Sequence, residues 1–277
     1  PGALEIKAKL VLLCAGAIGS PELLLRSGHP NPYDTLGRGL VLHPSLPIIG
    51  INEKPLVNYR GISGTIYSDH FYGSHGFYYE CLFGFPVYAS AMVPGLGAEH
   101  FDVMRAYTRI SGFGAMLVDT PRRQNRVRID DKTNKLAIDY RLSDEDKVRM
   151  RFAAQKGVEI MFAGGAKEVM LPSEEPVGTL QRPHFMRPEE AEFCRDLQLG
   201  PYQTIITSAH CQATVKMGEN IRECMVNSRG ESHWIRNLIV CDSSSFPTSC
   251  GANPMLSIMT MARYQGLRIA AEWGRYA

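Results

Sequence analysis

The sequence predicts a mixed α/β and α+β protein in which part of a doubly wound domain is interrupted by an inserted domain built on an antiparallel sheet. Two apolar strands, residues 9–14 and 237–241, each precede a helix, as in the repeating unit of a doubly wound sheet. Between them, short aromatic and β-branched stretches alternate with Gly, Pro, Asn and Asp, a pattern typical of antiparallel strands. We therefore place the doubly wound domain at 1–45 and 206–277, and the inserted domain at 46–205.

Length and composition are those of a globular protein. The 277 residues are 44% hydrophobic and 21% charged, enough for one large domain or two smaller ones. The net charge is +2 and no segment is rich in Lys and Arg, so we expect no nucleic-acid partner. The longest near-apolar run, 10–18, is shorter than the roughly 20 residues that span a bilayer, so we expect no membrane-spanning segment.

The seven cysteines predict reduced thiols. Their number is odd and their spacing is not paired, which favours a reducing compartment, the cytoplasm. The adjacent His210 and Cys211 fit no zinc-ligand spacing, so we predict no metal site. A hydrolase is not favoured either, because no Gly-x-Ser-x-Gly motif occurs.

The first strand is predicted to lead into a helix at 20–27. Ser20 is a suitable N-cap, Pro21 fits the first turn, and Gly28 ends the helix. The strand at 9–14 and this helix form one half-unit of the doubly wound sheet.

Small residues join this strand to its helix. Ala15, Gly16 and Ala17 stand at the carboxyl end of the strand, where small side chains let the backbone approach a cofactor. The alternative is that they only permit close packing of the strand against the helix.

The middle of the chain predicts a hairpin followed by a capped helix. Apolar and polar residues alternate at 127–129 and 136–140 on either side of the polar loop 130–135. Ser-Asp-Glu-Asp at 143–146 then predicts the start of a helix that runs toward Phe162.

Two further stretches of the middle region are distinctive. Residues 172–188 contain four prolines and predict a surface loop that borders an entrance. The aromatic-rich stretch 71–88 fits either buried residues of a sheet or the lining of a hydrophobic substrate channel.

The end of the chain predicts a second half-unit. Asp242 follows the strand at 237–241, Asn253 is a favoured N-cap, and Pro254 suits the first position of a long helix. The residues predicted to form its buried face are Met255, Ile258, Met259, Ala262, Gly266, Ile269 and Ala270.

Three polar residues of this region are candidate functional residues. Singly, His210, Asp242 and Asn253 have ordinary structural alternatives as a hydrogen bonder, a turn residue and a helix cap. Because all three occur where the chain returns to the doubly wound domain, their combination indicates a functional site.

Four segments, in order along the chain, match the signatures of one enzyme family. They are VLLCAGAIGSPELLLRSG at 11–28, LGRGLVLHP at 36–44, SAHCQATVKMG at 208–218 and LIVCDSSSFPTSCGANPM at 238–255. Together they resemble the glucose-methanol-choline (GMC) family of flavin-dependent oxidoreductases. The middle of the chain is similar to the branch of that family that includes long-chain alcohol oxidases.

The resemblance implies a Rossmann-like FAD-binding domain and an inserted substrate-binding domain. It implies that a small-molecule alcohol, of hydrophobic character, is oxidised by hydride transfer to FAD. His210 would take the hydroxyl proton, and Asn253 would hydrogen-bond the same oxygen. The helix that follows Asn253 would direct its positive end at the flavin ring. The residues implied to lie along the cofactor are Ala15, Gly16, Ala17, Asp242, Ser243, Asn253, Pro254 and Met255.

The chain departs from the family pattern at individual positions. Gly39 stands where Asn is usual, and Ala213 where Gly is usual. Cys211 and Val215 stand where Pro and Cys are common. These changes concern local packing rather than the base.

The family's Gly-x-Gly-x-x-Gly fingerprint is absent from these 277 residues. We therefore interpret the chain as the carboxyl-terminal portion of a longer enzyme, whose N-terminal FAD-binding half would be its partner. The alternative is a non-catalytic scaffold domain or subunit that docks a partner through the exposed face of the flavin domain. An apolar surface at 10–13 and along the last helix would mark that face.

Overall fold

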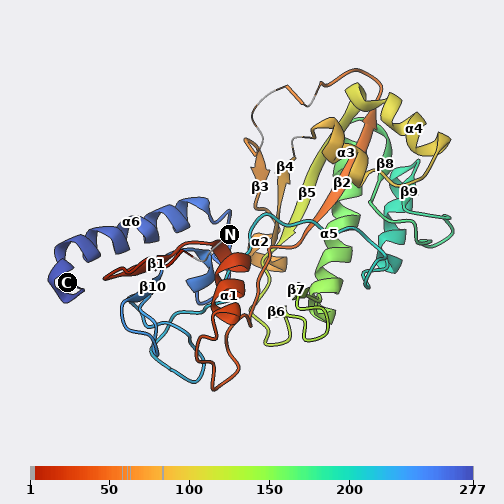
Figure 1. The fold of residues 1–277 in the computed structure, drawn as a ribbon. Helices are drawn as coiled ribbons and strands as arrows, with labels where there is room; N and C mark the ends of the chain where they lie inside the picture. The colour runs from red at the N-terminus through yellow and green to blue at the C-terminus, as the bar shows by residue number, and fades with distance from the viewer. Residues whose placement is uncertain (1–3, 58, 61, 63, 83, 277) are drawn as a thin grey trace. The chain divides into compact units, whose positions relative to one another are not determined.

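The computed structural model describes residues 4–57, 59–60, 62, 64–82 and 84–276, which fall into two compact units (Figure 1). Unit 1 comprises Pro1–His43, Asp119–Arg141 and Ala209–Ala277, and unit 2 comprises Pro44–Val118 and Leu142–Ser208. The chain therefore leaves unit 1 twice and returns to it twice.

The segment 119–141 was expected in the inserted domain, and it clusters with unit 1 instead. The reason is a backbone connection to the segment after the first helix. Val127 N donates to Gly37 O at 2.8 Å, and Gly39 N donates to Asn125 O at 2.9 Å. By its sequence this hairpin resembles the antiparallel strands of the inserted domain. Long-range backbone hydrogen bonds nevertheless hold it in unit 1.

Unit 1 contains the two half-units that the sequence predicts. Strand β1 (Val11–Leu13) pairs in parallel with β10 (Leu238–Val240), and helix α1 (Gly16–Arg26) follows β1. The predicted hairpin is confirmed as β6 (Arg126–Ile129) and β7 (Leu136–Asp139), which pair antiparallel.

Helix α1 begins four residues earlier than the sequence predicts. Its N-cap position is Ala15, and Ser20 lies inside the helix, fully buried, so the prediction of Ser20 as the cap is wrong. The predicted end is confirmed: Gly28 has φ +66°, and His29 N donates to Leu24 O at 3.0 Å. This is a Schellman ending, which needs a residue in the left-handed region.

Helix α6 (Met255–Ala271) follows a 3₁₀ turn η3 (Ser243–Ser245) and precedes η4 (Trp273–Arg275). Its N-cap position is Pro254, so Asn253 lies one residue before the cap and the prediction that Asn253 caps this helix is wrong.

The buried face of α6 also differs from the prediction. Of the predicted residues Ile269 is buried, whereas Met255 and Met259 are 72% and 61% exposed. Gln265 and Arg268, which were not predicted, are also buried. On the buried side Ile269 packs with Ile239 and Tyr276, and Arg268 donates to the carbonyl of Arg229 at 2.9 Å. The spacing of apolar residues along a helix does not show which polar side chain will be buried by a hydrogen bond to a distant backbone group.

Unit 2 is built on a six-stranded sheet whose neighbouring strands are all antiparallel, as predicted for this region. The strand order is β3-β4-β5-β2-β8-β9. The strands are β2 (Ser45–Asn52), β3 (Tyr67–Ser68), β4 (Phe77–Cys81), β5 (Ile110–Leu117), β8 (Ala166–Met170) and β9 (His184–Phe185).

The helices of unit 2 are short except one. The long helix α5 (Asp144–Ala163) begins with the predicted capping box, in which Ser143 and Asp146 exchange side-chain to backbone hydrogen bonds. The others are α2 (Tyr72–His75), α3 (Pro86–Met92), α4 (Ala98–Arg105), η1 (Tyr107–Arg109) and η2 (Pro188–Asp196). Of the predicted loop 172–188, residues 172–183 contain no helix or strand, whereas 184–185 form β9 and η2 begins at Pro188.

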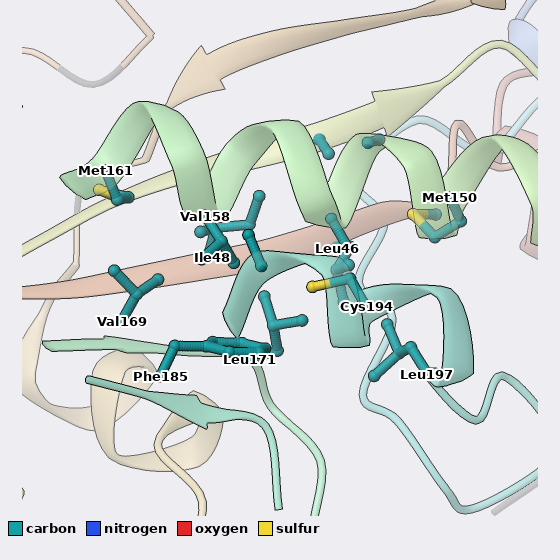
Figure 2. Packing of buried hydrophobic residues seen from close by; sticks show 14 of the residues in the cluster. Leu46, Ile48, Met150, Val158, Met161, Val169, Leu171, Phe185, Cys194 and Leu197 are labelled. Atoms are coloured by element: carbon teal, nitrogen blue, oxygen red, sulfur yellow. The ribbon is translucent and has the colours of Figure 1, made fainter. Parts of the chain in front are cut away.

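The central strand β2 is buried on both faces. Leu46 and Ile48 join the core under α5 and η2, whereas Ile49 and Ile51 pack with residues of α3, α4 and β5. Figure 2 shows Ile48 and Val158 of α5 pointing into the same cluster as Phe185 and Leu171.

The aromatic residues of β4 belong to these cores. Phe77, Tyr78 and Tyr79 are buried, and Tyr79 donates its hydroxyl to Ala153 O at 2.7 Å. Of the two explanations for the stretch 71–88, buried sheet residues account for these three side chains; Phe83 lies outside the described residues.

All seven cysteines are free thiols in the structure. Over the residues that the structure covers, no helix has the length and apolar character needed to cross a bilayer.

A buried glycine in α5 sets the distance between this helix and β2. A Cβ atom at Gly157 would lie 2.0 Å from Ile48 Cδ1. We expect Gly157→Ala to destabilise the protein by about 1–2 kcal/mol, because the overlap outweighs the roughly 1 kcal/mol that alanine gains in a helix. Ile48→Val removes Cδ1, so the double variant should lose less stability than the sum of the single variants.

Urea unfolding followed by circular dichroism measures these effects. The control is Gly266→Ala in α6, where an added Cβ meets open space, and we expect it to stabilise by about 0.5–1 kcal/mol. Additive effects of the Gly157 and Ile48 substitutions would show that this contact does not set the helix position.

Candidate functional site

His210 and His43 face each other across two short backbone segments of unit 1. Val41 and Gln212 form an antiparallel bridge, in which Val41 N donates to Gln212 O at 3.2 Å and Gln212 N donates to Val41 O at 3.0 Å. In antiparallel pairing, moving two residues in opposite directions along the two segments reaches the next opposed pair on the same side. His43 and His210 lie two residues from this isolated bridge, in opposite directions along the two segments. His43 N donates to Asp119 rather than to the facing segment, so the bridge brings the two segments together and the ring contact completes the approach.

The two imidazoles are within hydrogen-bond distance. The Nδ1 atoms lie 3.3 Å apart, and the ring centroids are 5.3 Å apart at an interplanar angle of 85°. His43 is buried, and its Nε2 is hydrogen-bonded to Ser249 Oγ. His210 is partly exposed, so the described chain leaves one of the two rings accessible.

Asp119 fixes the backbone that carries His43. Its carboxylate accepts hydrogen bonds at 3.0 Å from Leu42 N and from His43 N, and at 2.7 Å from the Tyr140 hydroxyl. His43 has φ +48°, a left-handed conformation that is uncommon outside glycine. The carboxylate therefore holds a backbone conformation that the sequence around His43 would not adopt by preference.

The buried side chain of Gln212 connects His210 to the loop before α6. Its amide Nε2 donates to His210 O at 3.1 Å, and its Oε1 accepts from Cys250 N at 3.1 Å. Ser249, which contacts His43, precedes Cys250, and Asn253 follows three residues later. The segment with the candidate base and the segment with Asn253 are thus joined through Gln212.

Asp242 anchors the first turn of α1. Its Oδ2 accepts from Gly16 N at 3.0 Å and from Ser20 Oγ at 2.5 Å, and its Oδ1 accepts from Ser244 N at 2.8 Å. A carboxylate at the start of a helix also interacts favourably with the helix dipole. Asp242 therefore has a structural role at the carboxyl ends of β1 and β10.

A proline inside α1 explains a second contact between distant segments. Pro21 has no N–H, so the carbonyl of Ala17 lacks its usual donor within the helix. The hydroxyl of Thr214 donates to this carbonyl at 2.7 Å, and Thr214 is fully buried. The side chain of Thr214 thus supplies the donor that the Ala17 carbonyl of α1 lacks.

The small residues at the start of α1 differ in their surroundings. Ala15 is exposed, and Gly16 has φ +74° with open space where a Cβ would lie. Ala17 is buried at 3% exposure, so packing inside the protein explains its small size. Of the three, Ala15 and Gly16 border open space and Ala17 does not.

The other residues that the sequence associates with a cofactor lie on the η3 to α6 segment. Ser243 is buried, and its carbonyl accepts from Ala213 N at 3.0 Å. Pro254 is buried, whereas Asn253 and Met255 are exposed at the start of α6. The first-turn N–H groups of a helix have no acceptor within the helix, so this exposed start can receive an anionic or polar ligand.

Two departures from the family pattern concern left-handed residues. Gly39 has φ +82°, a conformation that both Gly and Asn adopt readily, so Gly in place of Asn is compatible with the backbone. Ala213 has φ +73°, where Gly would be unstrained, and it is buried.

His43, Asp119, Ser249 and Gln212 were not identified from the sequence. The one available signal was the His-Pro pair at 43–44 within the family-like segment, whose pairing with residue 210 depends on long-range register. Among the described residues, no cluster of His, Cys, Asp and Glu could hold a metal ion.

Sequence comparison identifies related proteins. Two family profiles, both described as GMC oxidoreductase, match residues 2–45 and 121–262. An uncharacterized GMC-type oxidoreductase of Mycobacterium tuberculosis is 30% identical over 264 residues, 94% of this chain and 39% of the relative. A long-chain-alcohol oxidase of Arabidopsis thaliana is 28% identical over 284 residues, 95% of this chain and 37% of the relative. The chain thus spans less than half the length of these relatives.

Solved structures share the fold. A formate oxidase of Aspergillus oryzae superposes with a TM-score of 0.66 at 15% identity, over 97% of this chain and 55% of that chain. A pyridoxine 4-oxidase from Mesorbium loti superposes with a TM-score of 0.58 at 17% identity, over 95% of this chain and 52% of that chain. The predicted fold class, part of a Rossmann-like domain with an inserted antiparallel sheet, is confirmed by these matches.

The contact between Thr214 and Ala17 can be tested by an isosteric substitution. Thr214→Val removes the only hydroxyl of this side chain and leaves the buried Ala17 carbonyl without that donor, so we expect a loss of about 1–3 kcal/mol. Thr214→Ser keeps the hydroxyl and should lose less. Thermal unfolding of the three proteins measures the difference, and an unchanged stability of Thr214→Val would show that the hydroxyl does not supply a needed donor.

The buried His43 predicts that stability falls in acid. Burial, and secondarily the neighbouring His210, lowers the pKa of His43 from 6.5 to about 4. The unfolded chain therefore binds the proton first as pH falls, so stability is complete above about pH 6.5 and decreases as the pH approaches 4. The loss between pH 7 and pH 5 should be about 2 kcal/mol.

His43→Asn removes this titration, and Asn also tolerates the left-handed backbone. We expect the pH dependence of the urea midpoint between pH 7 and pH 5 to become shallower in this variant. An unchanged slope would mean that His43 is not the group responsible.

Proposed function

Because this chain belongs to the GMC oxidoreductase family, we propose that it supplies the substrate-binding and base-bearing part of a flavin-dependent enzyme that oxidises the CH–OH group of an alcohol. In this proposal unit 1 is the remaining part of the FAD-binding domain and unit 2 is the substrate-binding domain. His210 is the base that takes the hydroxyl proton. The observation that supports this role is the ring contact of the partly exposed His210 with the buried His43, beside the bridge between Val41 and Gln212.

A positioned base is what alcohol oxidation requires. A carbinol carbon gives up hydride readily only when its oxygen gains alkoxide character, so a base must take the hydroxyl proton. Histidine is suited to this because its pKa lies near neutral pH. Asn253 would donate a hydrogen bond from its amide to the same oxygen, and the exposed start of α6 would favour negative charge beside it.

The residues present fit one part of a flavin site. Open space at Gly16, the carboxyl ends of the parallel strands β1 and β10, and the exposed start of α6 provide room and polar N–H groups. FAD bound there would accept the hydride equivalent from the substrate carbon. The sequence contains no glycine-rich cradle for the pyrophosphate. The residues we assign to cofactor contacts are Ala15, Gly16, Ser243, Asn253, Pro254 and Met255.

Ala17 and Asp242 need separate treatment within this assignment. Both were implied to lie along the cofactor, and both already have partners within unit 1. We propose that they act by shaping the β1–α1 turn. Asp242 holds the Gly16 N–H, and Ala17 leaves room for Thr214.

The proposed substrate is a primary alcohol with an apolar chain. The relatives named long-chain-alcohol oxidases support this class. We propose the cytoplasm as the location, because seven free thiols favour a reducing compartment.

The proposed partner is an N-terminal FAD-binding half. A two-stranded parallel sheet is too small to be stable alone, and parallel strands are normally buried on both faces. Here Val11 and Leu12 of β1 are 52% and 48% exposed. Further exposed apolar residues of unit 1 lie on α6: Met255, Leu256, Met259, Tyr264 and Leu267. Additional strands and helices of the same domain would cover this surface.

The same surface supports a second candidate function. A non-catalytic scaffold domain or subunit would use this apolar surface to dock a partner, without oxidising an alcohol. The two proposals differ in whether flavin binds and is reduced by substrate.

The first test is a visible absorption spectrum after incubation with FAD and desalting. We expect little retained flavin with the chain alone, and retained flavin when an N-terminal segment with the glycine fingerprint is co-expressed. A long-chain primary alcohol should then bleach the flavin bands. His210→Ala should retain the flavin but slow bleaching by about 10²–10⁴-fold, the usual contribution of a general base.

The control is His233→Gln in the same unit, whose ring is hydrogen-bonded to Gly218 O and which we expect to bleach at the normal rate. If the chain alone retained flavin and the alcohol bleached it, the result would support the enzymatic function and contradict the need for an N-terminal partner. Binding of the N-terminal segment without retained flavin would favour the scaffold.

A further inference from the structure

The two facing imidazoles constrain each other's protons. Each neutral ring carries one N–H, and a hydrogen bond between two Nδ1 atoms needs a proton on one of them and a lone pair on the other. His43 Nε2 also contacts Ser249 Oγ, which can donate or accept. Two arrangements therefore satisfy the neutral pair.

In the first arrangement, His43 carries its proton on Nε2 and donates it to Ser249. Its Nδ1 then accepts from the Nδ1–H of His210, and the lone pair of His210 lies on Nε2. In the second arrangement, His43 donates from Nδ1, so neutral His210 carries its proton on Nε2 and has no lone pair there to act as a base.

Protonation of His210 selects between them. Imidazolium carries protons on both nitrogens, so protonated His210 can only donate from Nδ1, and a neutral His43 must accept. In the first arrangement His43 already accepts at Nδ1, so His210 can be protonated without moving the proton of His43 from one ring nitrogen to the other. A hydrogen bond with a charged donor is also stronger than a neutral one.

His43 is suited to remain a neutral acceptor. It is 1% exposed, its backbone N–H donates to the carboxylate of Asp119, and both of its ring nitrogens have hydrogen-bond partners. Burial and the neighbouring His210 lower the pKa of His43 to about 4, so it stays neutral while His210 takes a proton.

We propose that His43 is a positioning residue, which holds Nδ1–H of His210 and thereby keeps the lone pair of His210 on Nε2, the atom that acts as the base. In this arrangement Ser249 Oγ accepts the hydrogen bond from Nε2–H of His43, and the carboxylate of Asp119 accepts from the backbone N–H of His43. The proposal rests on the proposed function only in naming His210 as a base. The tautomer itself is a property of the chain without cofactor or substrate.

Nitrogen-15 NMR of the labelled chain tests the tautomer directly. Long-range couplings between ring nitrogens and ring protons identify which nitrogen is protonated, and His210→Gln identifies the signals of His210 by their loss. We expect neutral His210 to be protonated on Nδ1. A wild-type spectrum with the proton on Nε2 would overturn the proposal, whatever the variants show.

Two variants at position 43 test the acceptor. In His43→Asn the side-chain Oδ1 lies near the position of the imidazole Nδ1 and can accept, so the tautomer of His210 should be kept. His43→Leu has no acceptor, so the preference for Nδ1–H should be lost and the pKa of His210 should fall by about one unit. Circular dichroism at the same pH confirms that each variant is folded.

An unchanged tautomer and an unchanged pKa of His210 in His43→Leu would contradict the positioning role. These NMR results do not depend on flavin, so an unchanged tautomer in His43→Leu would leave the base role of His210 intact. Conversely, the expected tautomer together with a His210→Ala enzyme that still bleaches at the normal rate would overturn the base role and leave the positioning contact in place.

Discussion

The parallel pairing of β1 with β10 joins the two ends of the chain, and the organisation of unit 1 depends on it. Leu13 lies opposite Val240, and Cys241 N donates to Leu13 O at 2.9 Å. This places Asp242 at the start of α1, where its carboxylate binds the first N–H of the helix. This pairing connects residues more than two hundred positions apart. The long segment between them can therefore form a separate unit while the two strands stay paired.

Buried side chains of one segment complete the backbone hydrogen bonds of another throughout unit 1. Thr214 supplies the donor that Pro21 removes from α1, Asp119 accepts from the backbone before Pro44, and Gln212 connects two backbone groups of different segments. An unpaired buried backbone group costs free energy comparable to a lost hydrogen bond. The four family-like segments are therefore interdependent parts of one structure, and their polar residues have structural roles besides any role in catalysis.

The candidate site combines an accessible histidine with a buried neutral one. Burial raises the pKa of Asp119, while its hydrogen bonds from two backbone N–H groups and Tyr140 act in the opposite direction. The same carboxylate holds His43 in a left-handed conformation that few residues adopt. Sparsely populated backbone conformations of this kind cluster at functional sites.

The sequence by itself determined the fold class, the hairpin β6–β7, the capped helix α5 and the strands β1 and β10, because these follow from local periodicity and local capping residues. Only the tertiary structure decided that α1 begins at Gly16, that α6 buries Gln265 and Arg268, and that 119–141 belongs to unit 1. It also decided that His43 faces His210. Each of these depends on hydrogen bonds between residues far apart in the chain, and neither periodicity nor local propensity records which distant partner will satisfy a buried polar group.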